Sequence, residues 1–136
     1  MTYPFREDMN PSKKKRHTKQ AAAKAAADRL FSKIVRAKGF CEHCGKAAGV
    51  QLQCAHWISR TYSNTRTDFD NAFCLCAGCH RFFTADPTAW STWTLEQRGR
   101  ETYDRLREAA NEHSKMWWPD EVARLREIAK REGIAA

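Results

Sequence analysis

CEHCG at residues 41–45 and CAGCH at residues 76–80 decide the fold of this chain. Each stretch carries a Cys-x-x-Cys pair, and two intervening residues let both thiolates of a pair reach one metal ion from a tight turn. Two such pairs complete a tetrahedral shell of four thiolates, which is the closed arrangement of a structural zinc site. The sequence therefore predicts a Zn²⁺ ion, without an open position for a reacting water, held by Cys41, Cys44, Cys76 and Cys79.

The two remaining cysteines, Cys54 and Cys74, have no partner at ligand spacing, and we expect them to be buried as small apolar side chains. Six cysteines in a secreted chain would indicate disulfides, whereas paired spacing in a cytoplasmic chain favours metal. No apolar run approaches the roughly 20 residues of a membrane span, and the basic N-terminus does not resemble a secretion signal. We therefore expect a cytoplasmic protein with no membrane partner.

The formal net charge of +8 is concentrated at the N-terminus. Residues 1–40 hold eleven Lys or Arg and three acidic residues, so the remainder of the chain is neutral overall. We expect residues 1–17, with the run KKKRH, to form a basic arm without stable structure of its own. Such an arm either binds a polyanion, most simply nucleic acid, or serves as a solvated tail that aids solubility.

Helical patterns flank the cysteine-rich centre on both sides. Residues 18–38 are rich in Ala and Lys and precede Gly39, which predicts a helix that ends there. Residues 87–132 predict a helical tail, in which Gly99 allows the stretch before residue 112 to be two helices.

The centre, residues 40–85, predicts a small mixed core. VQLQCAHWI, residues 50–58, alternates as a strand does, and a polar loop follows it. NAFCLC, residues 71–76, is either a second strand or the approach to the short helix predicted for residues 76–85. The fold class is therefore mainly helical α+β, with a zinc-stapled core between an N-terminal helix and C-terminal helices, in a single domain over residues 18–136.

Three polar residues lie between or beside the cysteine pairs. His56 falls on the predicted strand, Asn71 in the loop and His80 at the start of the short helix. Cleavage of a phosphodiester needs a general base, a group that orients this base, and a divalent metal at the phosphate. Strand, loop and helix could bring these three functions together.

This stretch, Cys41 to Ala85, resembles the HNH, or His-Me finger, nuclease superfamily, whose core is the ββα-metal fold. The resemblance implies His56 as general base, Asn71 as the residue that orients the loop, and His80 as the ligand of a catalytic Mg²⁺ or Mn²⁺. Over roughly residues 41–132 the pattern is similar to the NinG (Rap) family of phage recombination nucleases. That family implies a phage or prophage protein that cuts branched recombination intermediates, such as Holliday junctions, in the bacterial cytoplasm.

One position departs from the superfamily pattern. Many members have Asp or His directly before the catalytic histidine, where it binds the metal, and here that residue is Ala55. His80 is then the one ligand that the pattern identifies. Asp68 or Asp70 would complete the shell, or water and phosphate would fill it, as Mg²⁺ tolerates.

DNA is the expected partner, and basic side chains are its expected contacts. A homodimer would supply the two cuts that resolve a four-way junction. The alternative functions are a DNA-binding module whose catalysis has been lost, which Ala55 favours, and an HNH protein that assists phage DNA packaging. The candidate phosphate contacts are Lys13, Lys14, Lys15, Arg16, Arg60, Arg66 and Arg81.

Overall fold

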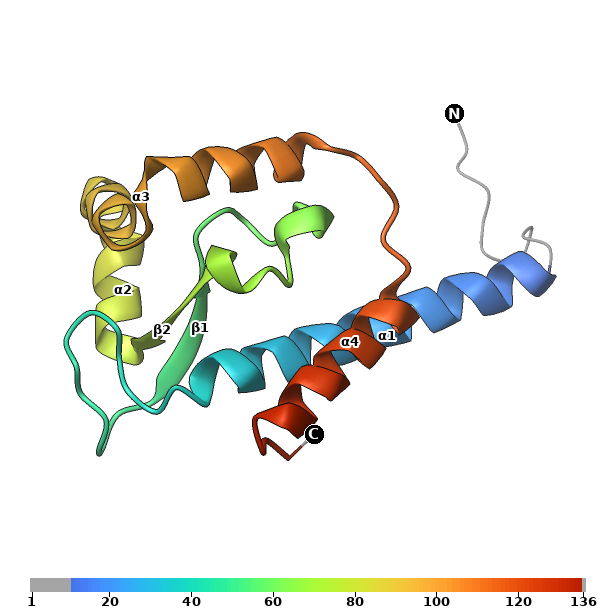
Figure 1. Ribbon diagram of the computed structural model, residues 1–136, viewed down its shortest axis with the longest axis horizontal. Helices are drawn as coiled ribbons and strands as arrows, with labels where there is room; N and C mark the ends of the chain where they lie inside the picture. The colour runs from blue at the N-terminus through green and yellow to red at the C-terminus, as the bar shows by residue number, and fades with distance from the viewer. Residues whose placement is uncertain (1–10, 136) are drawn as a thin grey trace. The chain divides into compact units, whose positions relative to one another are not determined.

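The computed structural model describes residues 11–135, which form four α-helices and one two-stranded sheet. In chain order the described elements are α1 (Pro11–Arg36), β1 (Leu52–His56), the 3₁₀ turns η2 (Ser63–Thr65) and η3 (Phe69–Asn71), β2 (Ala72–Cys76), α2 (Ala77–Ala85), α3 (Pro87–Asn111) and α4 (Trp118–Arg131). The fold is mainly helical α+β, as the sequence predicts (Figure 1). None of the described helices has the length and apolar character needed to cross a bilayer.

The chain divides into two compact units. The first unit comprises the chain up to Leu30 together with the segment from Trp117 onward, and the second comprises Phe31–Met116. The predicted metal and catalytic residues all belong to the second unit.

In the first unit, the start of α4 lies against α1 (Figure 1). Trp118 is buried at the start of α4, and its backbone N–H donates to Gln20 Oε1 of α1 at 2.7 Å. The apolar stripe of α4, with Val122 and Leu125 at its centre, is buried as helical periodicity predicts.

The helix α1 begins earlier than the sequence predicted. We expected the basic run to lie in an arm without stable structure, yet Lys13–Arg16 form part of α1, with exposed side chains. Lys and Arg have high helix propensity, and Pro11 takes the first helical position, where its missing N–H costs nothing. The rest of the predicted arm, residues 1–10, lies outside the described residues. The helix also ends at Arg36 rather than residue 38.

In the second unit, β1 and β2 pair antiparallel, so NAFCLC forms a strand that ends where α2 begins. The register places Leu52 opposite Cys76 and His56 opposite Ala72. Figure 1 shows α2 beside this sheet, with α3 beginning near the end of α2 and running across the top of the view.

The core of the second unit forms between the sheet and the two helices that follow it. Phe73 and Leu75 of β2 are buried with Phe83 of α2, and Trp90 and Trp93 of α3 pack against them. The helix α3 is interrupted at Gly99, whose φ of +83° lies in the left-handed region that favours glycine. The division that the sequence allowed at this glycine is therefore present.

Candidate functional site

The four cysteines of the two Cys-x-x-Cys pairs come together in one cluster. Each can offer its sulfur to a common ion, and the four sulfurs lie within 4.8 Å of one another. In the first pair, Gly45 adopts a φ of +77° and donates its N–H to the carbonyl of Cys41. In the second pair, the Cys76 sulfur caps α2 by accepting from the N–H of Cys79 at 3.4 Å. This arrangement can hold a metal such as zinc, as the spacing predicted.

The surroundings of the cluster lower the pKa of one cysteine, Cys41, and raise the pKa of another, Cys79. Burial alone would raise the pKa of Cys41, but backbone N–H donors from Cys44, Cys76 and His43 outweigh it and lower that pKa to about 6. Burial raises the pKa of Cys79, and hydrogen bonds to the neighbouring thiols raise it further. A bound metal would displace the protons that remain on such a cluster.

His43 lies between the first two ligands and is exposed. Its Nδ1 nevertheless lies 3.2 Å from the sulfur of Cys79. Its ring packs edge-on against Phe83 and Trp93, with centroids 4.7 and 5.4 Å away. His43 therefore supports the cysteine cluster from outside without being one of the four ligands.

His56 ends β1, where its imidazole meets the following loop. Its Nε2 donates to the backbone carbonyl of Arg66 at 2.9 Å, because a carbonyl can only accept. In the neutral tautomer the lone pair that can take a proton is then on Nδ1. The ring also lies against Phe31, with centroids 5.7 Å apart. Orientation and tautomer are therefore both set by the protein.

Asn71 is completely buried and joins the two ends of the loop. Its Oδ1 accepts from the N–H of Ile58 at 2.7 Å, and its Nδ2 donates to the carbonyls of Ile58 and Thr65 at 2.9 and 3.0 Å. Its own carbonyl accepts from the N–H of Trp57. Because Arg66 follows Thr65, this bracing holds the carbonyl to which His56 donates.

We predict that Asn71→Ala destabilises the protein by about 2–3 kcal/mol, because it strands a buried backbone N–H and two carbonyls without their partner. Chemical denaturation measures this difference. Asn111→Ala is the matched control, because Asn111 is exposed at the end of α3. An Asn71→Ala variant as stable as the control would contradict the bracing role.

A second set of contacts fastens the same loop to α3. Arg98 donates to the carbonyls of Phe69 and Asp70, at 3.3 and 2.5 Å. Arg105 forms ion pairs with Asp68 and Asp70, at 3.2 and 2.7 Å. The two aspartates that we considered as metal ligands are thus partners of an arginine and do not cluster with His80. Among the described residues, the four cysteines form the only group of three or more such ligands.

His80 lies in the first turn of α2, directly after the last cysteine of the cluster. Its Nδ1 donates to the amide oxygen of Gln53 on β1 at 2.7 Å. This bond leaves the lone pair of the neutral ring on Nε2, which is the arrangement typical of a metal-binding histidine. Gln53 was not predicted from the sequence; strand alternation places it on the same face of β1 as Ala55, which lines the pocket with His80.

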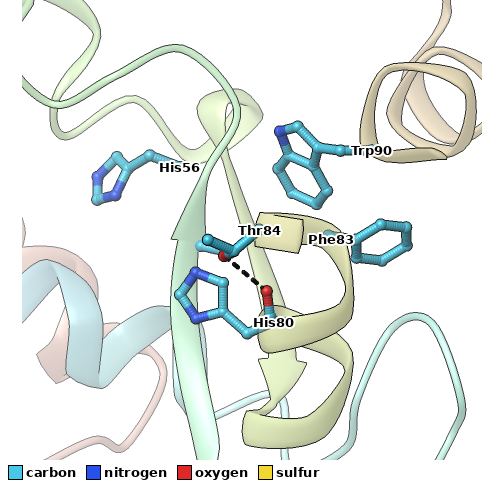
Figure 2. A pocket seen from close by; sticks show the side chains of 6 residues that line it. His56, His80, Phe83, Thr84 and Trp90 are labelled. Atoms are coloured by element: carbon cyan, nitrogen blue, oxygen red, sulfur yellow. Dashed lines mark hydrogen bonds between the residues drawn. The ribbon is translucent and has the colours of Figure 1, made fainter. Parts of the chain in front are cut away.

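The two histidines line one pocket with a volume of about 120 Å³. Figure 2 shows their imidazoles on the left of the view and the rings of Phe83 and Trp90 on the right. Ala55, buried and without a polar side-chain atom, forms part of the wall. The pocket therefore combines two oriented imidazoles, from β1 and α2, with an apolar side formed by Phe83 of α2 and Trp90 of α3.

The predicted phosphate contacts differ in their availability. Arg60 and Arg81 are exposed, as are the four basic residues of the run on α1. Arg66 is half-buried, and its Nη1 donates to the carbonyl of Arg60 at 2.7 Å. Arg66 therefore contributes to the internal structure of the loop as well as to its charge.

Comparison with known proteins gave no match for this chain among protein-family models, curated proteins or solved structures.

Proposed function

We propose that this chain is a metal-dependent DNA endonuclease of the HNH type, with His56 as general base and His80 as ligand of the catalytic metal. One observation carries the proposal: His56 and His80 line the same pocket, and each imidazole is oriented through a hydrogen bond to an oxygen acceptor. A single oriented histidine is common in protein cores. Two that line one pocket, with His80 directly after a cysteine of the cluster, fit the chemistry of phosphodiester hydrolysis better than a structural role.

In this proposal His56 removes a proton from the attacking water at Nδ1. Imidazole suits this task because its unperturbed pKa lies near neutral pH. The carbonyl of Arg66 holds the ring by its other nitrogen and would stabilise the imidazolium that forms. Asn71 acts through the loop, since it holds the segment that supplies this carbonyl.

The residues present fit a divalent metal with few protein ligands. His80 would bind the ion through Nε2, and Ala55 adds no ligand, so water and phosphate oxygens would fill the other positions, as Mg²⁺ accepts. A bound Mg²⁺ or Mn²⁺ would neutralise charge on the scissile phosphate and the leaving oxygen. We assign Zn²⁺ to the four cysteines. Its closed shell would hold residues 41–44 against residues 76–79 and would leave no position for a reacting water.

We predict that His80→Ala needs a higher concentration of Mn²⁺ or Mg²⁺ for half-maximal cleavage, by at least about tenfold, while its zinc content is unchanged. The reason is that the variant loses the one protein ligand of the catalytic ion and none of the cysteines. Cleavage rates across a metal titration, with elemental analysis of the same samples, measure both quantities. A titration curve that matches the wild type would remove His80 from the metal site.

A defect of the same kind is expected for Gln53→Ala, because the partner that fixes the tautomer of His80 is lost; such changes cost about 10- to 100-fold in metal affinity or activity. Gln51→Ala is the matched control, since Gln51 is exposed just before β1. Gln53→Ala behaving as Gln51→Ala does would show that the hydrogen bond plays no part in metal binding.

Branched DNA is the substrate that we propose, in the cytoplasm of a bacterial host of a phage or prophage. The resemblance to the NinG (Rap) family supports this choice, and the exposed cations of α1, with Arg60 and Arg81, supply charge for backbone contacts. A panel of single-stranded, duplex, flap and four-way-junction DNA with Mg²⁺ or Mn²⁺ tests it. We expect the four-way junction to be cut fastest, and equal rates on linear duplex would reject the branched substrate.

A second candidate is a DNA-binding module that does not cut. Ala55 favours it, because the position before the proposed base carries no ligand and the described acidic residues nearest in sequence are paired with Arg105. The two candidates separate in one assay: the module binds DNA at every metal concentration and leaves it intact.

A further inference from the structure

Cys54 of β1 and Cys74 of β2 lie directly opposite each other in the sheet. They belong to neither half of the metal cluster. The sequence led us to expect two small apolar side chains, both buried, because neither cysteine has a partner at ligand spacing; Cys74 is buried, whereas Cys54 is partly exposed. The antiparallel register brings them to the same face of the two strands.

The hydrogen-bond pattern defines which kind of cross-strand pair they form. The N–H of Trp57 donates to the carbonyl of Asn71, and the N–H of Ala77 donates to the carbonyl of Gln51. Both are directly opposed pairs in this register, and hydrogen-bonded pairs alternate with non-hydrogen-bonded ones along an antiparallel ladder. The pair of Cys54 and Cys74 lies three positions along the ladder from each of these hydrogen-bonded pairs. Because three is an odd number, it is a non-hydrogen-bonded pair.

That class of pair suits a disulfide. Its Cα atoms lie about 4.5 Å apart and its side chains approach more closely than in the other class. Disulfides span Cα separations of about 4.4–6.8 Å. The two sulfurs can therefore be joined without moving the strands.

The two thiols differ in access. Cys74 is completely buried, and its backbone is fixed on both sides by Glu42: its N–H donates to Glu42 Oε2 at 2.6 Å, and its carbonyl accepts from the N–H of Glu42 at 2.8 Å. Cys54 is partly exposed. An oxidant from solvent would meet Cys54 first and leave Cys74 to complete the reaction.

We propose that Cys54 and Cys74 are a modification site that forms an intramolecular disulfide with a small-molecule disulfide, such as oxidised glutathione, as oxidant. The Cys54 thiolate attacks one sulfur of the oxidant, which forms a mixed disulfide and releases one thiolate. The Cys74 thiolate then attacks the Cys54 sulfur and releases the second thiolate. Two electrons pass to the oxidant, and the protons of the two cysteines end on the two released thiols.

The bridge would close the segment that carries His56, the loop and Asn71, since all of them lie between the two cysteines in the chain. The bridge leaves the four cluster cysteines unchanged, because their thiolates would be bound to the metal ion. Formation of this disulfide does not require nuclease activity, so its test does not depend on the proposed function.

The test treats the full-length, zinc-loaded protein with oxidised glutathione, then denatures and alkylates it for intact-mass and peptide mass spectrometry. We expect the loss of two hydrogen atoms, a peptide link between Cys54 and Cys74, four alkylated cysteines and an unchanged zinc content. A persistent glutathione adduct on the wild type, a link to a cluster cysteine with zinc loss, or no reaction would each overturn the proposal.

Single variants test the order of the two steps. Cys74→Ser, or Cys74→Ala should the serine not be accommodated, is expected to stop at a glutathione adduct on Cys54. Cys54→Ser is expected to remain unmodified, because Cys74 is completely buried. The reverse pattern would contradict the assignment of Cys54 as the attacking thiol.

Discussion

Replacement of His56 by alanine should lower the rate of DNA cleavage by about 10²- to 10⁴-fold, which is the usual contribution of a positioned general base. The imidazole is held at the end of β1 by the carbonyl of Arg66, so its removal takes away the base without touching the cysteine cluster or His80. Single-turnover cleavage at saturating DNA measures the effect, because the rate then reports the chemical step and not binding.

Two further variants make this result specific. His56→Gln keeps a side-chain N–H that can donate to the carbonyl of Arg66 but has no basic nitrogen, so we expect it to be as slow as His56→Ala. His113→Ala is the matched control, because His113 is exposed outside the elements that form the pocket. A His56→Ala variant that folds, keeps its zinc and cuts at the wild-type rate would reject the assignment.

Loss of one cluster cysteine should have the largest effect on stability. Cys41 is completely buried, and its sulfur lies among the three others, so Cys41→Ser removes a ligand and leaves a poor substitute in its place. The binding free energy of structural zinc is on the order of 10 kcal/mol and becomes folding free energy in such sites. We therefore expect the second unit to unfold in this variant at temperatures where the wild type is folded.

Thermal unfolding with elemental analysis of zinc measures both consequences. Cys54→Ser is the matched control, since Cys54 lies on the same sheet but outside the cluster. We expect it to retain zinc and to melt close to the wild type. Equal melting temperatures for Cys41→Ser and Cys54→Ser, or a folded wild type without zinc, would contradict a structural metal.

The features that sequence predicted well are local ones. The Cys-x-x-Cys spacing predicted the cluster because each pair is fixed within a single turn, and the glycine in the first turn supplies the backbone angle. The strand β1 was predicted from the alternation in residues 50–58. The end of the short helix α2 was predicted from Pro87, which follows it. Gly99 marked the interruption of α3 because only glycine adopts its conformation without strain.

The features that sequence missed depend on contacts across the fold. Gln53 becomes relevant only when α2 packs on β1 and brings His80 to it. Asp68 and Asp70 looked available as metal ligands because Arg105, their partner, is more than thirty residues away. The helical state of Lys13–Arg16 was missed for another reason: a run of charge was read as disorder, although these residues have high helix propensity.

Cleavage of plasmid and four-way-junction DNA by the zinc-loaded wild type, with and without added Mg²⁺ or Mn²⁺, tests the central claim most directly. We predict no cleavage until the divalent metal is added, then hydrolysis that rises with metal concentration while the zinc content stays constant. Protein that is folded, contains zinc and binds DNA, but leaves every substrate intact at all metal concentrations, would contradict it.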